Sequence, residues 1–309
     1  MSQFNAPHFQ SHEAARAYLE AIRWGAERVC PHCGTVGKSY ENKKKPGVYR
    51  CAAKECRKDF SVTTKSVMES SHIKLHIWLQ AFYLMASSKK GVSSHQLHRA
   101  LGVTYKTAWF LTHRIREAMR AGGLMAPFLG KGGKPVEVDE TFIGRVKGMP
   151  KGKAAWAHKN VVLTLVERGG AARSFHVDGV RAGDLLPIIR NNLSKEAKLM
   201  TDEANYYKII ADFEGIASHQ TVNHSKDEYV RYEAGEAIST NTVEGYYSIF
   251  KRGMKGVYQH CSEKHLHRYL AEFDFRYSNR VALGIGDGER ADLAVKGAAG
   301  KRLTYRQAN

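Results

Sequence analysis

The sequence predicts an α/β protein in two parts, a small cysteine-containing region with helices and a larger domain built around a sheet. Two observations lead to this prediction. Four of the five cysteines lie within 27 residues near the N-terminus. From residue 136 onward, three strand-like runs are followed by alternating helical and strand-like segments. The first pattern is typical of a metal-binding module, and the second is typical of a sheet covered by helices.

The charge of the chain is high and unevenly distributed. The 309 residues carry a net charge of +18. Residues 1–134 hold 22 Lys and Arg against 8 Asp and Glu, whereas residues 135–309 hold 26 against 22. The first part is therefore expected to bind a polyanion, and nucleic acid is the best candidate. No apolar run approaches the length of a membrane span and no signal peptide is visible, so we expect a cytoplasmic protein with no membrane partner, nucleoid-associated when bound to DNA.

The four clustered cysteines predict a zinc ribbon with a leading helix over residues 11–64. They form two close pairs, Cys30 with Cys33 and Cys51 with Cys56. This spacing is typical of a four-thiolate structural zinc site. Two disulfides would be the alternative, but nothing else in the chain is typical of a secreted protein. His32 lies inside the first pair and is expected to face solvent or DNA rather than the metal.

A helix-turn-helix region is predicted over residues 72–121. After a helical pattern at 72–87, a short helix ends at Leu101, Gly102 turns the chain, and Thr104 caps a longer helix. In such a motif the start of the second helix contacts bases in the major groove. The residues predicted to bind DNA there are Thr104, Tyr105, Lys106 and Thr107. A plain pair of helices is the alternative, and the charge bias favours DNA binding.

Glycine-rich stretches at 121–123 and 130–133 predict a boundary, followed by an α/β domain of the ribonuclease H type over residues 135–280. Expected strands lie at 136–144, 160–167, 172–177, 197–202 and 219–223, and expected helices at 182–193, 204–213 and from 240 onward. The segment 281–309 is rich in Gly and Ala and is predicted to be a loosely ordered C-terminal tail.

Two acidic residues of this domain are candidates for metal chemistry. Alternation along the strand places Asp139 on one face with Glu137 and Thr141. Asp202 closes an apolar strand and should emerge at the carboxyl edge of the sheet. Two-metal phosphoryl transfer needs carboxylates that converge from separate elements. Acids at strand ends are also common without any such role.

The helix from residue 240 carries a third group of polar residues. Asn241, Glu244 and Lys251 share one face of it, because they are spaced by one and two turns. They could face a sheet edge that carries Asp139 and Asp202. A structural ion pair between Glu244 and Lys251 is the alternative.

Four blocks of the sequence resemble the IS1595 family of transposases, whose catalytic part is the ISXO2-like domain. They read VEVDETFIG from residue 136, LMTDEANYY from 199, VNHSKDEYV from 222, and NTVEGYYSIFKRGMKGVYQHCSEKHLHRYLAEFDFRYSNR from 241. With the zinc ribbon and the helix-turn-helix, the resemblance covers residues 11 to 280. It implies a DDE-type transposase of a bacterial insertion sequence, with a ribonuclease H-like core.

The resemblance also implies roles for single residues. Asp139 and Asp202 would be the first two metal-binding acids, and Glu244 or Asn241 the third. Glu244 is favoured because a carboxylate binds Mg²⁺ more strongly than an amide. Lys251, with Arg252 beside it, would contact DNA phosphate, and His224 lies in a family block without a role that can be derived.

The reaction implied is cleavage at terminal inverted repeats followed by strand transfer into target DNA. It would use two Mg²⁺ or Mn²⁺ ions, bridged by Asp139, besides the structural zinc. Because one element has two ends, a homodimer or a larger synaptic complex on double-stranded DNA is expected. The sequence is also compatible with two other functions: a DNA-binding regulator with an inert second domain, and a nuclease that cuts DNA without joining strands.

Overall fold

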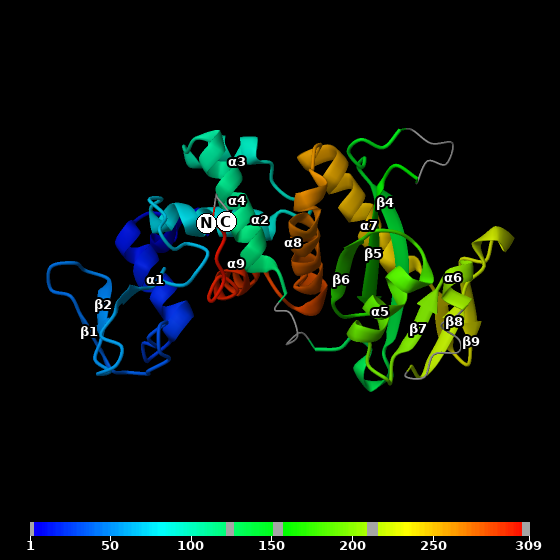
Figure 1. Ribbon diagram of the computed structural model, residues 1–309, viewed down its shortest axis with the longest axis horizontal. Coiled ribbons are helices and arrows are strands. Elements are labelled where there is room, and N and C mark those ends of the chain that lie inside the picture. The colour runs from blue at the N-terminus through cyan, green and yellow to red at the C-terminus, as the bar shows by residue number, and fades with distance from the viewer. Residues whose placement is uncertain (1–2, 122–126, 151–156, 209–215, 305–309) are drawn as a thin grey trace. The chain divides into compact units, whose positions relative to one another are not determined.

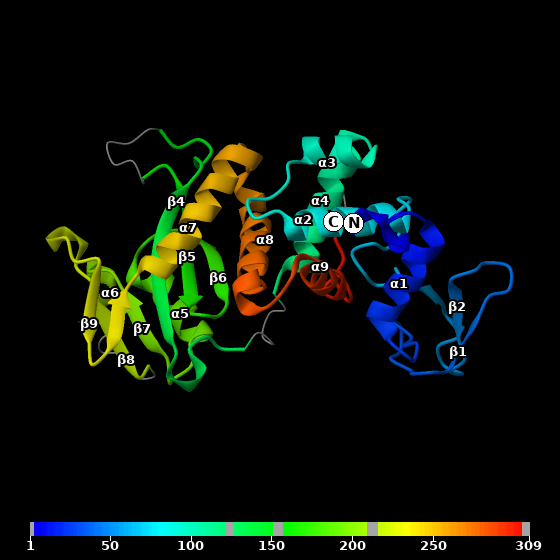
Figure 2. The ribbon, with the colours of Figure 1, turned by 180° about the vertical axis from the view of Figure 1, so that it is seen from behind.

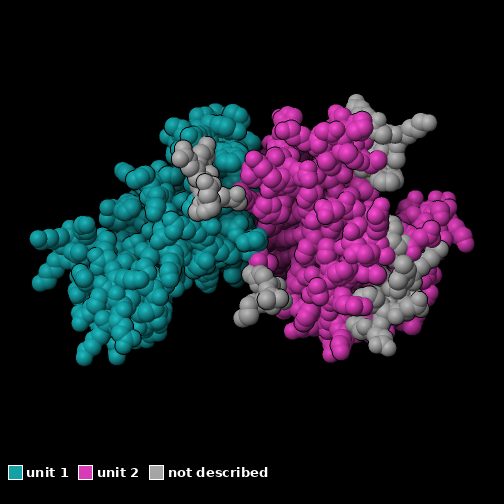
Figure 3. Space-filling model, in the orientation of Figure 1, with its two compact units in different colours: residues 1–120, 285–309 teal, residues 121–284 magenta. Residues whose placement is uncertain are grey.

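The computed structural model describes residues 3–121, 127–150, 157–208 and 216–304. The chain forms two compact units, which Figure 3 colours separately. The first contains residues up to 120 together with those from 285 onward, and the second spans residues 121–284. Among the described residues, no helix has the length and apolar character needed to cross a membrane.

The first unit begins with the predicted helix and ribbon. Helix α1, His12–Trp24, starts where the Ser11 side chain accepts a hydrogen bond from the Ala14 N–H at 3.1 Å. An antiparallel sheet of three short strands follows in the order β1-β2-β3 (Figure 1). Its strands are β1 Ser39–Glu41, β2 Val48–Cys51 and β3 Asp59–Ser61. Trp24, Tyr49 and Phe60 pack around the cysteines and give this small module its core.

Three helices follow the ribbon, and the predicted turn between the last two is confirmed. They are α2 Leu75–Ser87, α3 Ser94–Leu101 and α4 Tyr105–Met119. Gly102 ends α3 with a left-handed backbone at φ 63°, which glycine adopts without strain. The Thr104 side chain then accepts a hydrogen bond from the Thr107 N–H at 3.2 Å and caps α4.

The C-terminal segment belongs to this unit and does not form the loose tail expected from the sequence. Helix α9, Asp287–Lys296, packs against α2. After it, the Gly300 N–H donates to the Lys65 carbonyl at 2.8 Å. The expectation is wrong for these residues because their small side chains serve close packing: Gly297 lies directly against the Ala118 carbonyl, where a larger residue would collide. Residues 305–309 lie outside the described part of the chain.

The second unit is built on a mixed sheet of five strands in the order β6-β5-β4-β7-β8 (Figure 2). The strands are β4 Pro135–Ile143, β5 Asn160–Glu167, β6 Ala172–Val177, β7 Lys198–Thr201 and β8 Ser218–Thr221. β4, β5 and β6 pair antiparallel, whereas β7 runs parallel to β4 and β8 parallel to β7. The α/β sheet predicted from the sequence is therefore present.

Helices cover both faces of this sheet. On one face, α5 Ala182–Asn192 packs on a core that includes Val138, Leu163 and Leu199. On the other face, α7 Asn241–Gly253 and α8 Leu266–Ser278 pack on a core that includes Val162 and Val166. Helix α6, Asn205–Lys208, falls within the helix expected at 204–213, whose residues beyond 208 lie outside the described ranges.

A β-hairpin that was not predicted from the sequence leads into α7. Its strands are β9 Val230–Glu233 and β10 Glu236–Ser239, paired antiparallel. Only Thr240 separates β10 from the start of α7, so the hairpin fixes where that helix begins. At its other end, α7 continues into a π-helical turn over Met254–Tyr258.

Candidate active site and metal centres

The four clustered cysteines converge on one point. Their Sγ atoms all lie within 4.8 Å of one another, with 3.8 Å between Cys30 and Cys56 and 3.7 Å between Cys33 and Cys51. All four are free thiols. Zinc–sulfur bonds of about 2.3 Å in a tetrahedron place the sulfurs about 3.8 Å apart. The thiolate set therefore fits zinc.

His32 does not join this set. Its Nε2 donates to the Asp59 carbonyl at 3.2 Å, which ties the first cysteine pair to β3. The side chain is half-buried, so it faces solvent only in part. The expectation that it is not a metal ligand agrees with this hydrogen bond.

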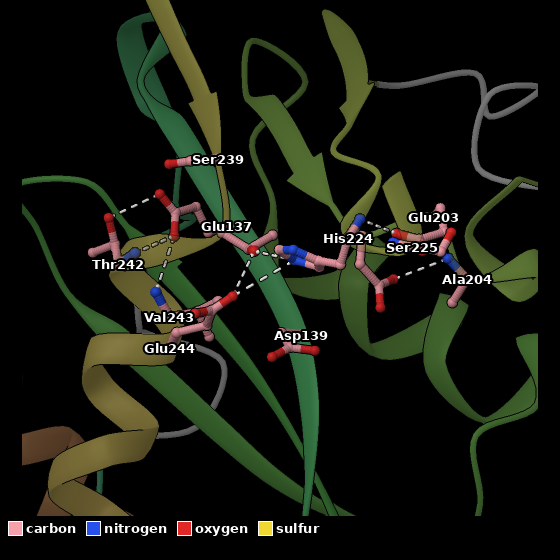
Figure 4. A network of polar contacts seen from close by, with 12 residues as sticks. Glu137, Asp139, Glu203, Ala204, His224, Ser225, Ser239, Thr242, Val243 and Glu244 are labelled. Atoms are coloured by element: carbon pink, nitrogen blue, oxygen red, sulfur yellow. Dashed lines mark hydrogen bonds and ion pairs between the residues drawn. The ribbon is translucent and has the colours of Figure 1, made fainter. Parts of the chain in front are cut away.

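The predicted acids of the second unit come from three elements. Asp139 lies on β4, Asp202 directly follows β7, and Glu244 lies in the first turn of α7. Because β7 runs parallel to β4, Asp202 emerges beside the strand that carries Asp139. Figure 4 shows the Asp139 and Glu244 side chains next to each other, with His224 on the other side of the same space.

These carboxylates are close enough to repel one another. Burial and the charge of Asp202, with a smaller contribution from Glu244, raise the pKa of Asp139 to about 7, although the nearby Lys251 ammonium opposes the shift. Burial and the neighbouring Glu203 also raise the pKa of Asp202. A bound divalent cation would relieve this repulsion, and carboxylate oxygens are the ligands that Mg²⁺ and Mn²⁺ prefer. The chemistry of these donors suits such an ion, and among the described residues only the four cysteines form a group of three or more side chains whose ligand atoms all lie within 4.8 Å of one another.

Of the two candidates for the third position, Glu244 is the one that contacts Thr240 and His224 and has an electrostatic effect on Asp139. Its Oε1 accepts from the Thr240 hydroxyl at 3.1 Å and lies 3.6 Å from His224 Nε2. Its charge also contributes to the raised pKa of Asp139. Asn241 lies at the first position of α7, one turn before Glu244, and both residues are exposed.

The two cations predicted to contact DNA lie near the end of α7. Lys251 Nζ lies 5.8 Å from the centre of the Tyr247 ring, and the Tyr247 hydroxyl donates to the Asp139 carbonyl at 2.6 Å. Because Tyr247 contacts both residues, Lys251 lies on the side of α7 that faces Asp139. Arg252 is exposed in the same turn.

The loop that carries His224 is anchored to the residue after Asp202. The Glu203 carboxylate accepts from the backbone N–H groups of His224 at 2.9 Å and Ser225 at 3.0 Å. His224 Nε2 also contacts the Thr240 hydroxyl at 3.1 Å. His224 thus bridges the loop after β8 and the start of α7, which no local pattern in the sequence could indicate.

Sequence reasoning placed Glu137 on the face of Asp139 but gave it no role. The structure buries it completely, with its carboxylate against Thr242 and Val243 at the start of α7 (Figure 4). The same carboxylate forms an ion pair with Arg168. A charged residue at an inward position of a strand was the available signal.

In the first unit, the predicted DNA-binding residues lie at the start of α4. Thr104, Tyr105 and Lys106 are exposed there, and Thr107 is half-buried. The Tyr105 ring stacks on His95 of α3 with 4.2 Å between ring centres. Ala108, one residue further along, is fully buried, so the exposed positions are confined to the first turn.

Family models match both parts of the chain. Residues 131–278 match the ISXO2-like transposase domain, and residues 10–59 match the transposase zinc-ribbon domain. The chain belongs to the IS1595 transposase family. The first match contains Asp139, Asp202 and Glu244, and the second contains all four clustered cysteines. The predicted family is therefore confirmed.

A relative from Halobacterium salinarum extends the likeness over most of the chain. It is named as an uncharacterized protein in transposable element ISH50 and is 26% identical over 289 residues. The alignment covers 87% of this chain and 91% of the relative. The likeness therefore includes the segments outside the two family matches.

Proposed function

We propose that this protein is the DNA transposase of an insertion sequence, which binds terminal inverted repeats and catalyses metal-dependent cleavage and strand transfer. The observation that carries the proposal is the placement of Asp139 on β4, Asp202 directly after the parallel neighbour β7, and Glu244 in the first turn of α7. Burial, with smaller contributions from Asp202 and Glu244, raises the pKa of Asp139 to about 7. Membership of a transposase family supports the proposal.

In this proposal Asp139, Asp202 and Glu244 hold two Mg²⁺ or Mn²⁺ ions. The ions would activate the attacking oxygen and neutralise charge on the attacking and leaving groups. The protein itself positions the scissile phosphate, because phosphoryl transfer depends mainly on alignment and electrostatics. Lys251, with Arg252 beside it, contacts DNA phosphate near the scissile bond. Glu244 rather than Asn241 is the third ligand, because only its side chain is tied to Thr240 and His224 in the described network.

The architecture supports a ribonuclease H-like core and separate DNA-binding modules. The domain has three antiparallel strands followed along the chain by two parallel strands, with helices on both faces of the sheet. This order of elements is the one from which the sequence predicted a ribonuclease H-like fold. The zinc ribbon and the exposed first turn of α4 bind the terminal repeats, with Lys and Arg on phosphate and a few side chains on bases. An element has two ends, so the active species is a homodimer or a larger complex on DNA.

One assay separates this function from its two rivals. Zinc-loaded protein is incubated with Mg²⁺ and a DNA fragment that carries the ends of its own element, and the products are scored for cleavage and joining. Cleaved and joined products are expected. Cleavage without joining would indicate a nuclease, and binding without metal-dependent cleavage would indicate a regulator and overturn the proposal.

A further inference from the structure

Glu137 occupies a position where a carboxylate is costly unless it is fully paired. Its side chain has no exposed surface, and it lies two residues before Asp139 on the same face of β4. Its partners lie far along the chain. One carboxylate oxygen accepts from the backbone N–H groups of Thr242 at 2.7 Å and Val243 at 2.9 Å. The other accepts from the Thr242 hydroxyl at 2.8 Å and from Arg168 Nε at 2.6 Å.

These contacts replace the usual cap of α7. The first N–H groups of a helix have no partner inside the helix, and the residue before it normally accepts from them. Thr240 occupies that position but makes no such hydrogen bond. Its hydroxyl donates instead to Glu244, at 3.1 Å. The start of α7 is therefore capped by a strand of the sheet, which ties the position of the helix to β4.

Arg168 extends the same arrangement to the chain that enters α7. It follows β5 and donates to the Ser239 carbonyl at 3.0 Å and to the Ser239 hydroxyl at 2.9 Å. It also donates to the Ala237 carbonyl. The end of β10 and the first turn of α7 are thus held by one partly buried ion pair, Arg168 with Glu137.

The residues held by Glu137 are the immediate neighbours of two site carboxylates. Asp139 lies two residues further on β4, and Glu244 follows Val243 on α7 (Figure 4). We propose that Glu137 is a positioning residue, which sets the separation of Asp139 and Glu244 and so the geometry of the metal site. The proposal rests on the proposed function, because it assigns these two carboxylates to metal binding. An error of about 1 Å in such a site can cost on the order of a hundredfold in rate.

The test compares full-length, zinc-loaded wild type with Glu137→Gln, which keeps the shape but places an amide NH₂ among donors. Glu272→Gln is the matched control, because Glu272 is also fully buried and paired with an arginine, Arg276, but on α8. Three quantities are measured: hydrogen exchange of the Thr242 and Val243 amides, the Mg²⁺ concentration that gives half-maximal cleavage, and affinity for end DNA.

In Glu137→Gln we expect the two amides to exchange at least about tenfold faster and the half-maximal Mg²⁺ concentration to rise about tenfold or more. DNA affinity should stay within about twofold of wild type, since the substitution is remote from the DNA-binding unit in sequence and leaves the surface charge unchanged. Glu272→Gln should lower the thermal stability of the protein and leave all three measured quantities unchanged. A folded Glu137→Gln protein with protected amides and a normal Mg²⁺ requirement would overturn the proposal.

If Glu137→Gln does not fold, Thr242→Ala decides the matter, because it removes only the hydroxyl contact to Glu137. An increase of about two- to threefold in the Mg²⁺ requirement is expected, and no increase would overturn the inference. If the wild type does not cleave DNA at all, the proposed function fails. The amide exchange then still shows whether Glu137 holds α7.

Discussion

The four-cysteine site and the proposed carboxylate site of this chain are built in opposite ways. The thiolate ligands lie between Cys30 and Cys56, on one small ribbon, with sulfur separations that already match a zinc tetrahedron. The proposed carboxylate ligands lie between Asp139 and Glu244, on β4, directly after β7 and on α7, and the charges of Asp202 and Glu244 add to burial in raising the pKa of Asp139. The thiolate site stabilises the fold of its own small module. The carboxylate site instead depends on the fold of a larger domain to bring its residues together.

This difference determines what each centre loses when it is altered. The ribbon has a small core of Tyr49, Phe60 and two of the cysteines, with Trp24 against it, so its ligands are a large part of its structure. The carboxylate centre lies on a sheet with apolar cores on both faces. Changes in the ribbon ligands should therefore affect folding, whereas changes in the carboxylates should affect chemistry.

The largest effect is expected at the carboxylate centre. Asp139→Asn and Asp202→Asn should each lower the rates of cleavage and strand transfer by roughly a thousandfold or more and leave the fold and end binding nearly intact. Glu140→Gln is the matched control on the opposite face of β4. Burial raises the pKa of Glu140 to about 8, so an amide there resembles the neutral carboxyl. Loss of folding in the Asp variants would show that these carboxylates serve the fold rather than the chemistry.

At the thiolate centre, metal removal should unfold the ribbon. Purified protein should contain about one equivalent of zinc, and a chelator or Cys33→Ser should unfold residues 30–61 and abolish specific DNA binding while residues 135–280 stay folded. Circular dichroism and hydrogen exchange measure this. Cys261→Ser, outside the four-thiolate set, should leave the zinc content unchanged. A ribbon that keeps its fold without metal would contradict the account.

The first unit also needs its distant C-terminal segment. A chain that ends at Gly284 lacks α9 and the hydrogen bond from Gly300 to Lys65, and loses the burial of Ala291, Ala294 and Val295. We expect the unfolding midpoint of the first unit to fall by several degrees or more, because about 3 kcal/mol of packing is lost. A chain that ends at Thr304 retains these contacts and serves as the control. Equal stability of the two chains would show that the ribbon and helices fold without the segment.

A smaller effect, on the pH dependence of stability, is expected from Asp274. This buried acid of the second unit lies outside the proposed cation site. Burial raises its pKa to about 6 from the ordinary 3.8, against the hydrogen bonds from Tyr246 and Ser174. The folded protein therefore keeps this proton up to about pH 6, while the unfolded chain releases it near pH 4. Stability contributed by the protonated form is lost as the pH rises between these values, by roughly 3 kcal/mol.

The control for this prediction is Asp274→Asn, which cannot titrate. Between pH 4 and pH 6 the free energy of unfolding should fall in the wild type relative to the variant, as measured by urea denaturation. Parallel pH profiles of the two proteins would show that the carboxyl does not titrate in this range.

Much of the fold could be predicted because its signals are local. The strands Asn160–Glu167 and Ala172–Val177 follow from apolar runs, and the start of α4 follows from Gly102 and Thr104. The hairpin was missed because β9 is largely exposed and neither β9 nor β10 contains a long apolar run. The C-terminal helix was missed because small residues that serve close packing resemble those of a loose tail.

The candidate site divides in the same way. Asp139, Asp202 and Glu244 were found because each lies in a recognisable strand or helix pattern. The roles of Glu137 and His224 depend on partners far along the chain, such as Thr242 and Thr240, and only the folded structure brings these together. Local patterns thus predicted the candidate ligands, while the contacts around them required tertiary structure.

Mn²⁺ binding shows whether the three carboxylates form one cation site. Zinc-loaded protein is bound to a pre-cleaved end duplex, and bound Mn²⁺ is measured by electron paramagnetic resonance. Binding should be weakened at least about tenfold in Asp139→Asn, Asp202→Asn and Glu244→Gln and unchanged in Glu140→Gln, with Asn241→Ala near wild type. Wild-type Mn²⁺ affinity in Asp139→Asn would contradict a shared site, and loss in Asn241→Ala but not Glu244→Gln would move the third ligand to Asn241.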